Sequence, residues 1–387
     1  MTSEPGSFAQ RTMLHRKPQI IEAVIADNDY PQFVVERLQR FKGEIISGKI
    51  KPLTKDAPDV EEWNRLQAEF ENRMWLELPW YFAEAYFYRR LLEAVEYFQP
   101  GPLQGYDPFQ ASKRKQLDES ILPLSLAIDA IDEIDYPELC FENLLHASLW
   151  GNRVDLSNLT VADEIRNRQA MIERENLLIN DFLKVFDAFQ RRSLSHVAFA
   201  NDNAGMELGF DILLADFLLR SNWVDKLTFF LKPYPFFVSD AMIKDLQETL
   251  KAYTQNSSPS LSHLGKRMER FISEGTLSLS DDWFWASARH FCEMPQSLYE
   301  EISCLDMVIL KGDVNYRRLL SDRHWPHTTP ITEIVDYFPT SFLVLRTLKG
   351  EIMVDLEEGE AERLEAEDPD WLINGKRGII QYVEQKL

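Results

Sequence analysis

The chain has 387 residues, of which 45% are apolar, so it can bury a sizeable core and by length is expected to form two or three domains. It carries 63 Asp and Glu residues against 42 Lys and Arg residues, for a formal net charge of -21. This negative charge repels a phosphate backbone and argues against general binding of nucleic acid. Acidic ligands can enter only where positive side chains gather locally.

The cysteines and the apolar runs limit the compartment of the protein. Cys140, Cys292 and Cys304 are far apart and lack a C-x-x-C pair, which argues against a disulfide framework and a thiolate zinc site. The start of the chain has no apolar region typical of a signal peptide, and no uninterrupted apolar run of about 18 residues occurs. We therefore expect a cytoplasmic monomer, with a nuclear location left open, that binds neither a membrane nor a nucleic acid.

The first part of the chain reads as helical. Residues 1–12 are predicted to form a disordered tail and residues 13–165 a helical domain. Residues 58–97 carry aromatic side chains, acids and arginines at three- and four-residue steps, which predicts two helices broken near Pro79. This spacing favours a packed helical core over an aromatic ligand-binding box. Further helical patterns cover 116–134, 137–150 and 172–192.

From residue 195 onward, short apolar runs alternate with helical patterns. The runs HVAFA, KLTFFL, DMVILK and FLVLRTL are apolar on both faces, which is typical of strands buried between helical layers in a largely parallel sheet. This alternation is the α/β signature, and we assign it to a domain over 166–387. No G-x-G-x-x-G, P-loop or G-x-S-x-G motif occurs. The helical patterns between the runs cover 205–220, 239–252, 258–273, 295–303 and 331–338.

Polar residues follow these predicted strands, at the edge where ligands collect in such sheets. Two carboxylates and an amide oxygen form an all-oxygen set that suits Mg²⁺ or Mn²⁺ and disfavours zinc. Basic groups add fixed positive charge, so the combination of metal and cation indicates a phosphate ligand. The residues are Asp202 and Asn203 after the first run, Asp240 after the second, Gly312, Asp313, Asn315, Tyr316 and Arg317 after the third, and Arg346, Thr347 and Lys349 at the fourth.

Each of these residues also has a plain structural use. Asp202, Asn203 and Asp240 can cap the helices that follow them, and Gly205 can relieve a tight turn. Lys349 can be a solvated lysine. The functional interpretation gains its weight from four strand ends that carry such residues together.

Several segments resemble, in order and approximate spacing, the metal-dependent damage-control phosphatases, a family first catalogued as domain of unknown function 89. The later segments are NDNAGMELGFDILLADFLL, KPYPFFVSD and LKGDVNYRRLL, and LPWYFAEAYFYRR and LWGNRVDLS look like N-terminal landmarks. The tetrad RTLK is similar to the mark of a eukaryotic subfamily that includes sugar phosphate phosphatases. The resemblance covers nearly the whole chain.

The resemblance implies a helical N-terminal region packed on a three-layer α/β/α sandwich with a largely parallel central sheet. It implies metal ligands at Asp202, Asn203 and Asp240, and catalytic roles for Asp202, Asp240 and Lys349, with the nucleophile left open between water and a carboxylate. Met206 and Asn201 depart from the pattern of the family. The implied substrate-binding residues are Asp202, Asn203, Glu207, Asp313, Val314, Asn315, Tyr316, Arg317 and Lys349.

The resulting functional prediction is a metal-dependent phosphomonoesterase that acts in metabolite damage control. Its substrates would be fructose 1-phosphate, fructose 6-phosphate or related hexose phosphates, and its cofactor would be Mn²⁺, Co²⁺, Ni²⁺ or Mg²⁺. Two alternatives stay open. One is an S-adenosylmethionine-dependent protein-glutamate O-methyltransferase, which the name of one relative suggests, and the other is a non-catalytic interaction protein.

Overall fold

The computed structural model of the chain describes residues 2, 4–151, 175–191 and 194–385. The chain divides into two compact units. Unit 1 contains Met1–Lys113, Tyr234–Ser239 and Ala286–Ala288, and unit 2 contains the rest. The domain boundary predicted between residues 165 and 166 lies outside the described residues, as does most of the LWGNRVDLS segment.

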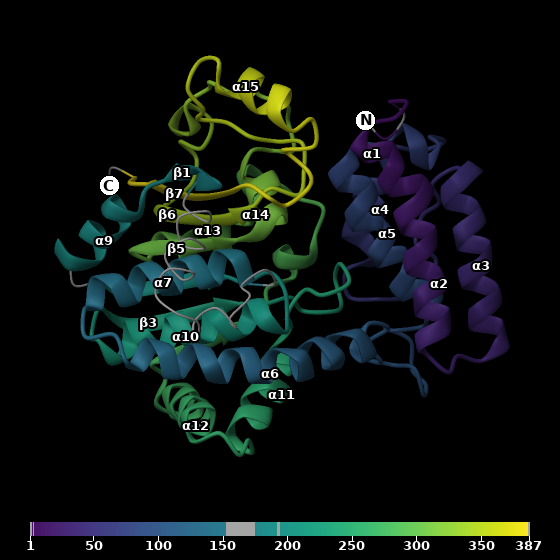
Figure 1. Cartoon of the computed structure of the whole chain (residues 1–387). Helices are drawn as coiled ribbons and strands as arrows, with labels where there is room; N and C mark the ends of the chain where they lie inside the picture. Colours follow the sequence, from purple (N-terminus) through teal and green to yellow (C-terminus); the bar gives the residue numbers. More distant parts are fainter. Residues whose placement is uncertain (1, 3, 152–174, 192–193, 386–387) are drawn as a thin grey trace. The chain divides into compact units, whose positions relative to one another are not determined.

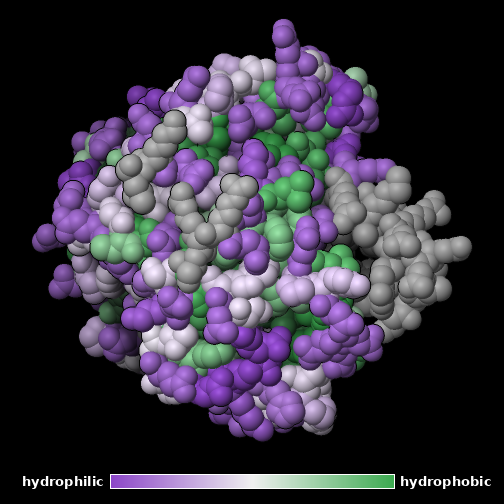
Figure 2. Space-filling model, turned by 90° about the vertical axis from the view of Figure 1, so that its left-hand side faces the viewer, coloured by the Kyte–Doolittle hydropathy of each residue, from purple (hydrophilic) through white to green (hydrophobic). Residues whose placement is uncertain are grey.

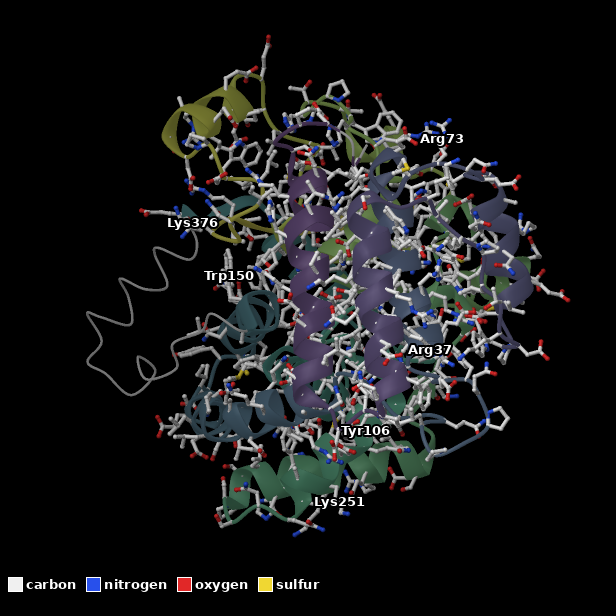
Figure 3. The ribbon with its side chains drawn as sticks, turned by 90° about the vertical axis from the view of Figure 1, so that its right-hand side faces the viewer. Arg37, Arg73, Tyr106, Trp150, Lys251 and Lys376 are labelled. Atoms are coloured by element: carbon white, nitrogen blue, oxygen red, sulfur yellow. The ribbon has the colours of Figure 1, made fainter. Side chains whose placement is uncertain are left out.

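Unit 1 is built from helices around an aromatic core. Figure 3 shows α2 and α3 side by side. The predicted break near Pro79 is confirmed, because α4 ends at Ala68 and Pro79 directly precedes α5. Trp75, Tyr86 and Phe87 are fully buried in one hydrophobic cluster, as expected of a helical core. The α-helices of this unit are α1 (Phe8–Arg11), α2 (Lys17–Asp27), α3 (Gln32–Ser47), α4 (Val60–Ala68) and α5 (Trp80–Ala94).

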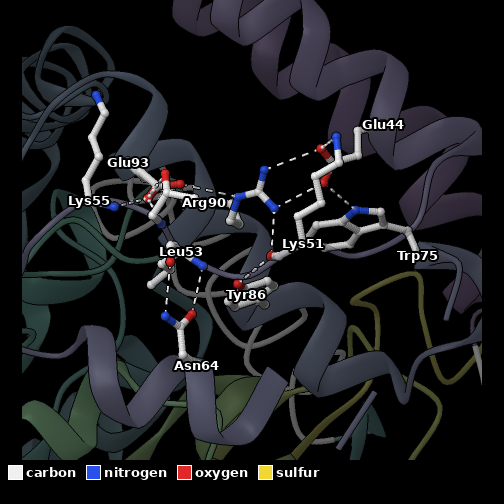
Figure 4. A network of polar contacts seen from close by, with 10 residues as sticks. Glu44, Lys51, Leu53, Lys55, Asn64, Trp75, Tyr86, Arg90 and Glu93 are labelled. Carbon is white, nitrogen blue, oxygen red and sulfur yellow. Dashed lines mark hydrogen bonds and ion pairs between the residues drawn. The ribbon is translucent and has the colours of Figure 1, made fainter. Parts of the chain in front are cut away.

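A polar network closes the rim of this aromatic core (Figure 4). Arg90 donates to Glu44 Oε1 and to the carbonyl oxygen of Lys51, at 3.0 Å each. Trp75 Nε1 also donates to Glu44 Oε1, at 3.2 Å, and the Tyr86 hydroxyl donates to the Lys51 carbonyl at 2.8 Å. The large aromatic side chains therefore bury their rings while their polar atoms keep partners.

Unit 2 contains a seven-stranded sheet in the order β1-β7-β6-β5-β2-β3-β4. Strands β2 to β6 pair in parallel, β7 is antiparallel to β6, and β1 is parallel to β7. The largely parallel sheet is thus confirmed, with β7 and β1, at one edge, running antiparallel to the other five strands. The strands are β1 (Leu177–Asn180), β2 (Leu194–Ala200), β3 (Val224–Phe230), β4 (Leu277–Ser280), β5 (Met307–Lys311), β6 (Ser341–Thr347) and β7 (Gly378–Val383).

Helices cover both faces of this sheet, which gives three layers (Figure 1). Alternate residues of β2 show the two faces, since Val197 and Phe199 belong to one hydrophobic cluster and Ala198 and Ala200 to the other. The first cluster includes residues of α6 (Gln110–Asp132), α7 (Pro137–Trp150), α9 (Phe182–Arg191), α10 (Met206–Arg220), α11 (Ile243–Thr254) and α12 (Pro259–Glu274). The second includes residues of α13 (Gln296–Ser303), α14 (Gly312–Leu319) and α15 (Glu360–Glu367).

The four predicted strand runs are confirmed as β2, β3, β5 and β6, but two helical predictions are wrong in part. Residues 177–180 lie inside the predicted helix 172–192 and instead form β1, because pairing with β7 overrides a local pattern that suits either element. Only Ile331–Glu333 of the predicted helix 331–338 is helical, as a 3₁₀ turn. Pro339 restricts the residue before it to extended backbone.

Hydrophilic residues cover most of the face shown in Figure 2, as expected for a chain in which 27% of the residues are charged. Cys140 is buried and Cys292 and Cys304 are exposed, and all three are free thiols. Among the described residues, the longest and most apolar helices fall short of what a membrane crossing requires.

A buried lysine of unit 1 couples stability to pH. Lys17, at the start of α2, is fully buried, forms an ion pair with Glu84 and lies 4.7 and 4.3 Å from the ring centroids of Phe87 and Tyr88. Burial lowers the pKa of Lys17 to about 8, although the charge of Glu84 acts in the opposite direction. The folded protein therefore releases this proton more readily than the unfolded chain does.

We predict that the stability of the wild type rises with pH as Lys17 titrates. Between the folded pKa of about 8 and the ordinary value of 10.5, the unfolded chain binds more protons at Lys17, so the free energy of unfolding increases with pH. Relative to a Lys17→Met/Glu84→Gln variant, the increase should reach up to about 3 kcal/mol across this range. Urea titrations followed by tryptophan fluorescence measure it, and a difference that does not change with pH would contradict the prediction.

Candidate active site

The turn after β2 combines an acid, an amide and a glycine for separate structural reasons. Asp202 is 8% exposed and Asn203 is half-buried, directly beyond the end of the strand. Gly205 has φ +73°, a conformation that L side chains rarely adopt, and a Cβ atom there would lie 2.8 Å from Gln116 Cβ. The glycine thus lets the chain enter α10 at once, and the polar pair stays at the carboxyl edge of the sheet.

The third predicted metal ligand lies beside this pair. The Ala241 amide donates to the carbonyl oxygen of Asp202 at 2.8 Å, and Asn203 and Asp240 form an isolated antiparallel bridge. Asp240 is 2% exposed. Backbone pairing therefore brings Asp202, Asn203 and Asp240 together from segments that lie 37 residues apart in the sequence.

The start of α14 approaches the same carboxylate. Strand β5 ends at Lys311, and α14 begins at Gly312 without an intervening loop. Gly312 has φ +80°, and a Cβ atom at this position would lie 2.0 Å from Asp202 Oδ2. Only glycine fits between the β5–α14 junction and Asp202, which explains why glycine is found at this strand end.

Hydrogen bonds fix the side chains of the polar pair. Asn203 Nδ2 donates to Asp202 Oδ2 and to Glu207 Oε2, each at 2.9 Å. Glu207 lies in the first turn of α10 and is 9% exposed. The amide nitrogen of Asn203 is thus directed at two carboxylates, which selects Oδ1 as the atom that can serve as a metal ligand.

Two buried lysines in this site were not predicted from the sequence. Lys232 Nζ lies 3.4 Å from Asp240 Oδ2 and donates to the carbonyl oxygen of Asn201 at 3.2 Å. Lys311 Nζ lies 3.0 Å from Asp211 Oδ1 and 3.6 Å from Glu207 Oε1. Both lysines are at most 2% exposed. The signal in the sequence was a lysine that follows or ends an apolar strand, where burial is expected. Because a buried lysine requires an acidic partner, such a position indicates a nearby carboxylate.

The donor atoms gathered here are of the chemical kind that a divalent cation prefers. Four carboxylates, those of Asp202, Glu207, Asp211 and Asp240, share the buried site with the ammonium groups of two buried lysines. The excess negative charge and the all-oxygen ligands are what Mg²⁺ or Mn²⁺ prefers. Over the described ranges, no group of three or more His, Cys, Asp or Glu side chains is arranged to hold a metal. The candidate set differs from such a group because its third member is an amide.

Electrostatics single out Asp202 among the site residues. Burial raises the pKa of Asp202 well above its ordinary range, and the neighbouring charges of Glu207 and Asp240 raise it further. The positive charges of Lys232 and Lys349 act in the opposite direction. A divalent cation held by these carboxylates would favour the ionised form of Asp202, because opposite charge stabilises a carboxylate.

The residues of the KGDVNYRR segment form a second cluster with the RTLK tetrad. Asp313 Oδ1 accepts from Arg346 Nε at 2.8 Å, and Asp313 Oδ2 accepts from Arg317 Nε at 3.1 Å. Burial alone would raise the pKa of Asp313, but the two guanidinium groups outweigh it and lower the pKa below its ordinary value. The guanidinium of Arg346 also lies 4.2 Å from the ring centroid of Tyr316. Asp313 is therefore a fixed anion between two arginines.

This cluster positions Lys349. The backbone amide of Lys349 donates to Asp313 Oδ1 at 3.3 Å, while its side chain is exposed. Among the residues that the structure describes, no acidic side chain forms an ion pair with the Lys349 ammonium, and its charge acts on Asp202. Arg317, which we expected to contact substrate, is 2% exposed and also donates to Asp322 at 2.6 Å.

Two further predicted substrate residues occupy different environments on α14. Asn315 is fully buried and its Nδ2 donates to the carbonyl oxygens of Ala200 and Lys311 at 3.1 and 2.9 Å. It therefore ties the end of β2 to the β5–α14 junction. Val314 is half-buried in the first turn of α14.

Comparisons with known proteins identify relatives over the whole chain. The family model of the damage-control phosphatase ARMT1-like domain matches residues 12–364. Damage-control phosphatase ARMT1 of Danio rerio is 32% identical over 97% of this chain and 95% of its own length, and that of Homo sapiens is 31% identical over 97% and 96%. A crystal structure of a DUF89 family protein from Pyrococcus horikoshii covers 98% of this chain and 99% of its own, with a TM-score of 0.50 and 15% identity, a likeness of fold alone.

We predict that Gly312→Ala disrupts the site and Gly275→Ala does not. Both glycines have positive φ, so each alanine should cost about 1–2 kcal/mol of stability. Only at Gly312 would the new Cβ collide with Asp202, whereas nothing lies within 4 Å of a Cβ at Gly275. Calorimetric titration with Mn²⁺ should therefore show binding that is lost or weakened at least about tenfold in Gly312→Ala alone. Equal binding by the two variants would contradict the role of the close approach.

Proposed function

The chain belongs to the damage-control phosphatase ARMT1-like family, and from this premise we propose that it hydrolyses sugar phosphates with a divalent metal ion held by Asp202, Asn203 and Asp240. It is a phosphatase of metabolite damage control. The observation that supports the proposal is that Asp202, Asn203 and Asp240 lie together at the carboxyl edge of the sheet, next to Gly312, and that the charge of Lys349 acts on Asp202.

We assign roles to the metal ion and to Lys349 from their positive charges. A bound Mn²⁺, Co²⁺, Ni²⁺ or Mg²⁺ ion would supply charge neutralisation at the phosphoryl group. Lys349 presents an exposed ammonium group whose charge acts on Asp202, so it can stabilise negative charge that develops on a phosphate at this place. The Lys349 backbone amide donates to Asp313 Oδ1, and Arg346 holds the same carboxylate, so these two residues keep the Lys349 backbone in place. Preorganised charge of this kind is the main source of catalysis in phosphoryl transfer.

The hydrogen-bond acceptors in the site are the reason that we propose a sugar as the rest of the substrate. Glu207 and Asp313 carry partly accessible acceptor oxygens, whereas Asn315, the third predicted acceptor, is fully buried and holds the β5–α14 junction instead. Acceptors in a phosphate-binding site are useful when the rest of the substrate offers donors. Hydroxyl groups of a hexose monophosphate are such donors, and the fructose phosphates are our primary candidates. Val314, Tyr316 and Arg317 complete the proposed binding segment on α14, which packs on β5 and β6.

The direct experiment is a panel of phosphate-release assays with each of the four metal ions. We expect fructose 1-phosphate and fructose 6-phosphate to be hydrolysed at least about tenfold better, in kcat/KM, than ethyl phosphate, because only the sugars offer hydroxyl donors. Chelation should abolish the activity, and Asp240→Asn should raise the metal concentration needed to restore it. Full turnover after exhaustive chelation would refute the metal, and equal rates on sugar and ethyl phosphates would refute the sugar site.

A second prediction concerns Lys349 and separates phosphatase from methyltransferase chemistry. Lys349→Met keeps most of the volume of the side chain and removes its charge, so the protein should fold normally. Loss of one charge-stabilising group should lower kcat for phosphate release by about 100-fold or more. Methyl transfer from a sulfonium donor develops no comparable negative charge and should be unaffected.

Phosphate release and methyl incorporation should be measured side by side at saturating Mn²⁺, with Lys376→Met as the control. Lys376 is an exposed lysine that pairs with Asp368 at 3.0 Å and has no place in the proposed site. Phosphatase turnover of the folded Lys349→Met variant within about twofold of the wild type would show that the catalytic role of Lys349 is wrong.

A further inference from the structure

Lys311 directly precedes Gly312, which packs against the proposed metal ligand Asp202. It is the last residue of β5 and has 0% exposure. Its ammonium group donates to the carbonyl and hydroxyl oxygens of Ser148 on α7 and lies 3.0 Å from Asp211 and 3.6 Å from Glu207 on α10. One buried cation therefore joins a strand to two helices that pack on the same face of the sheet.

The Asp211 carboxylate holds Lys311 in this position. Asp211 is fully buried and accepts a hydrogen bond from the Ser148 hydroxyl at 2.6 Å and one from Asn201 Nδ2 at 3.1 Å. Asn201, directly after β2, thus satisfies one oxygen of a buried acid. Both oxygens of Asp211 are therefore held by hydrogen bonds. The carboxylate in turn anchors the Lys311 ammonium group at a position 3.6 Å from Glu207 Oε1.

Glu207 connects Lys311 to the proposed metal ligand Asn203. Its Oε1 faces Lys311, and its Oε2 accepts from Asn203 Nδ2. The same amide nitrogen donates to Asp202 Oδ2 at 2.9 Å. The orientation of the Asn203 amide thus depends on a carboxylate that Lys311 neutralises.

We propose that Lys311 is a positioning residue that holds Glu207 in place and thereby keeps the Asn203 amide turned with its oxygen toward the metal. The inference rests on the metal site of the proposed function, though not on the identity of the sugar phosphate. Without Lys311, Glu207 would share a buried space with the Asp202 and Asp211 carboxylates and no cation beside it. Glu207 would then turn away from the neighbouring carboxylates, and the Asn203 amide would lose the partner that orients it. Groups that orient metal ligands in this way typically change metal affinity by about 10- to 100-fold.

The test is the affinity for Mn²⁺ alone, measured by calorimetry on the full chain without substrate. Because Lys311→Met leaves Asp211 as an uncompensated buried charge, the informative variant is Asp211→Asn/Lys311→Met, which removes both charges of that pair and leaves Glu207 without its cation. We expect this variant to keep the circular dichroism spectrum of the wild type and to bind Mn²⁺ about 10- to 100-fold more weakly. The matched control is Lys17→Met/Glu84→Gln, which neutralises a buried ion pair of unit 1 and should bind Mn²⁺ within about twofold of the wild type.

A mutant cycle through Glu207 separates positioning from a general structural effect. If Lys311 acts through Glu207, then adding Asp211→Asn/Lys311→Met to Glu207→Gln should change the Mn²⁺ affinity by less than about twofold. Multiplicative effects would overturn the proposal, and so would wild-type affinity in the Asp211→Asn/Lys311→Met variant. If the wild type binds Mn²⁺ but does not hydrolyse sugar phosphates, the proposed substrate is wrong. The mutant cycle then still decides whether Lys311 acts through Glu207, because it measures only Mn²⁺ affinity. A wild type that binds no Mn²⁺ overturns both proposals.

Discussion

Four carboxylates are buried close together at the carboxyl edge of the sheet, and their mutual repulsion is the constraint on which the rest of this site depends. Charges of like sign in a poorly solvated site repel one another, as the raised pKa of Asp202 reflects. Lys232 and Lys311 offset part of the repulsion. Two lysines do not neutralise four carboxylates, and the remaining negative charge is the reason for the cation site that we propose.

The backbone solves the related problem of bringing these groups close. The turn after β2, the segment around Asp240 and the junction at Gly312 all reach the same point because the carboxyl ends of parallel strands share one edge. The absence of a side chain at Gly312 lets α14 start against Asp202. The same junction fixes the Asp313, Arg317 and Arg346 cluster on the other side of the site, so one strand-to-helix transition organises both the acidic and the basic halves.

Asn201, directly after β2, links two buried charged residues. A buried amide costs free energy where its polar atoms have no partner. Its Nδ2 donates to Asp211, and its backbone oxygen accepts from Lys232. Asn201 thus joins Asp211 and Lys232 beside the site, while its Oδ1 is buried without a hydrogen-bond partner among the described residues.

The sequence by itself determined the α/β class, the four central strands and the strand-end residues, because apolar runs and polar residues at their ends are local patterns. The resemblance added the family and the assignment of individual residues. Only the tertiary structure decided that residues 177–180 pair with β7 as a strand, that Arg346 and Arg317 enclose Asp313, and that Lys232 and Lys311 lie among the acids. A lysine or a short apolar run has the same local sequence whether it meets solvent, an acid or another strand. The contacts that decide among these outcomes join residues far apart in the chain, and only the packed fold creates them.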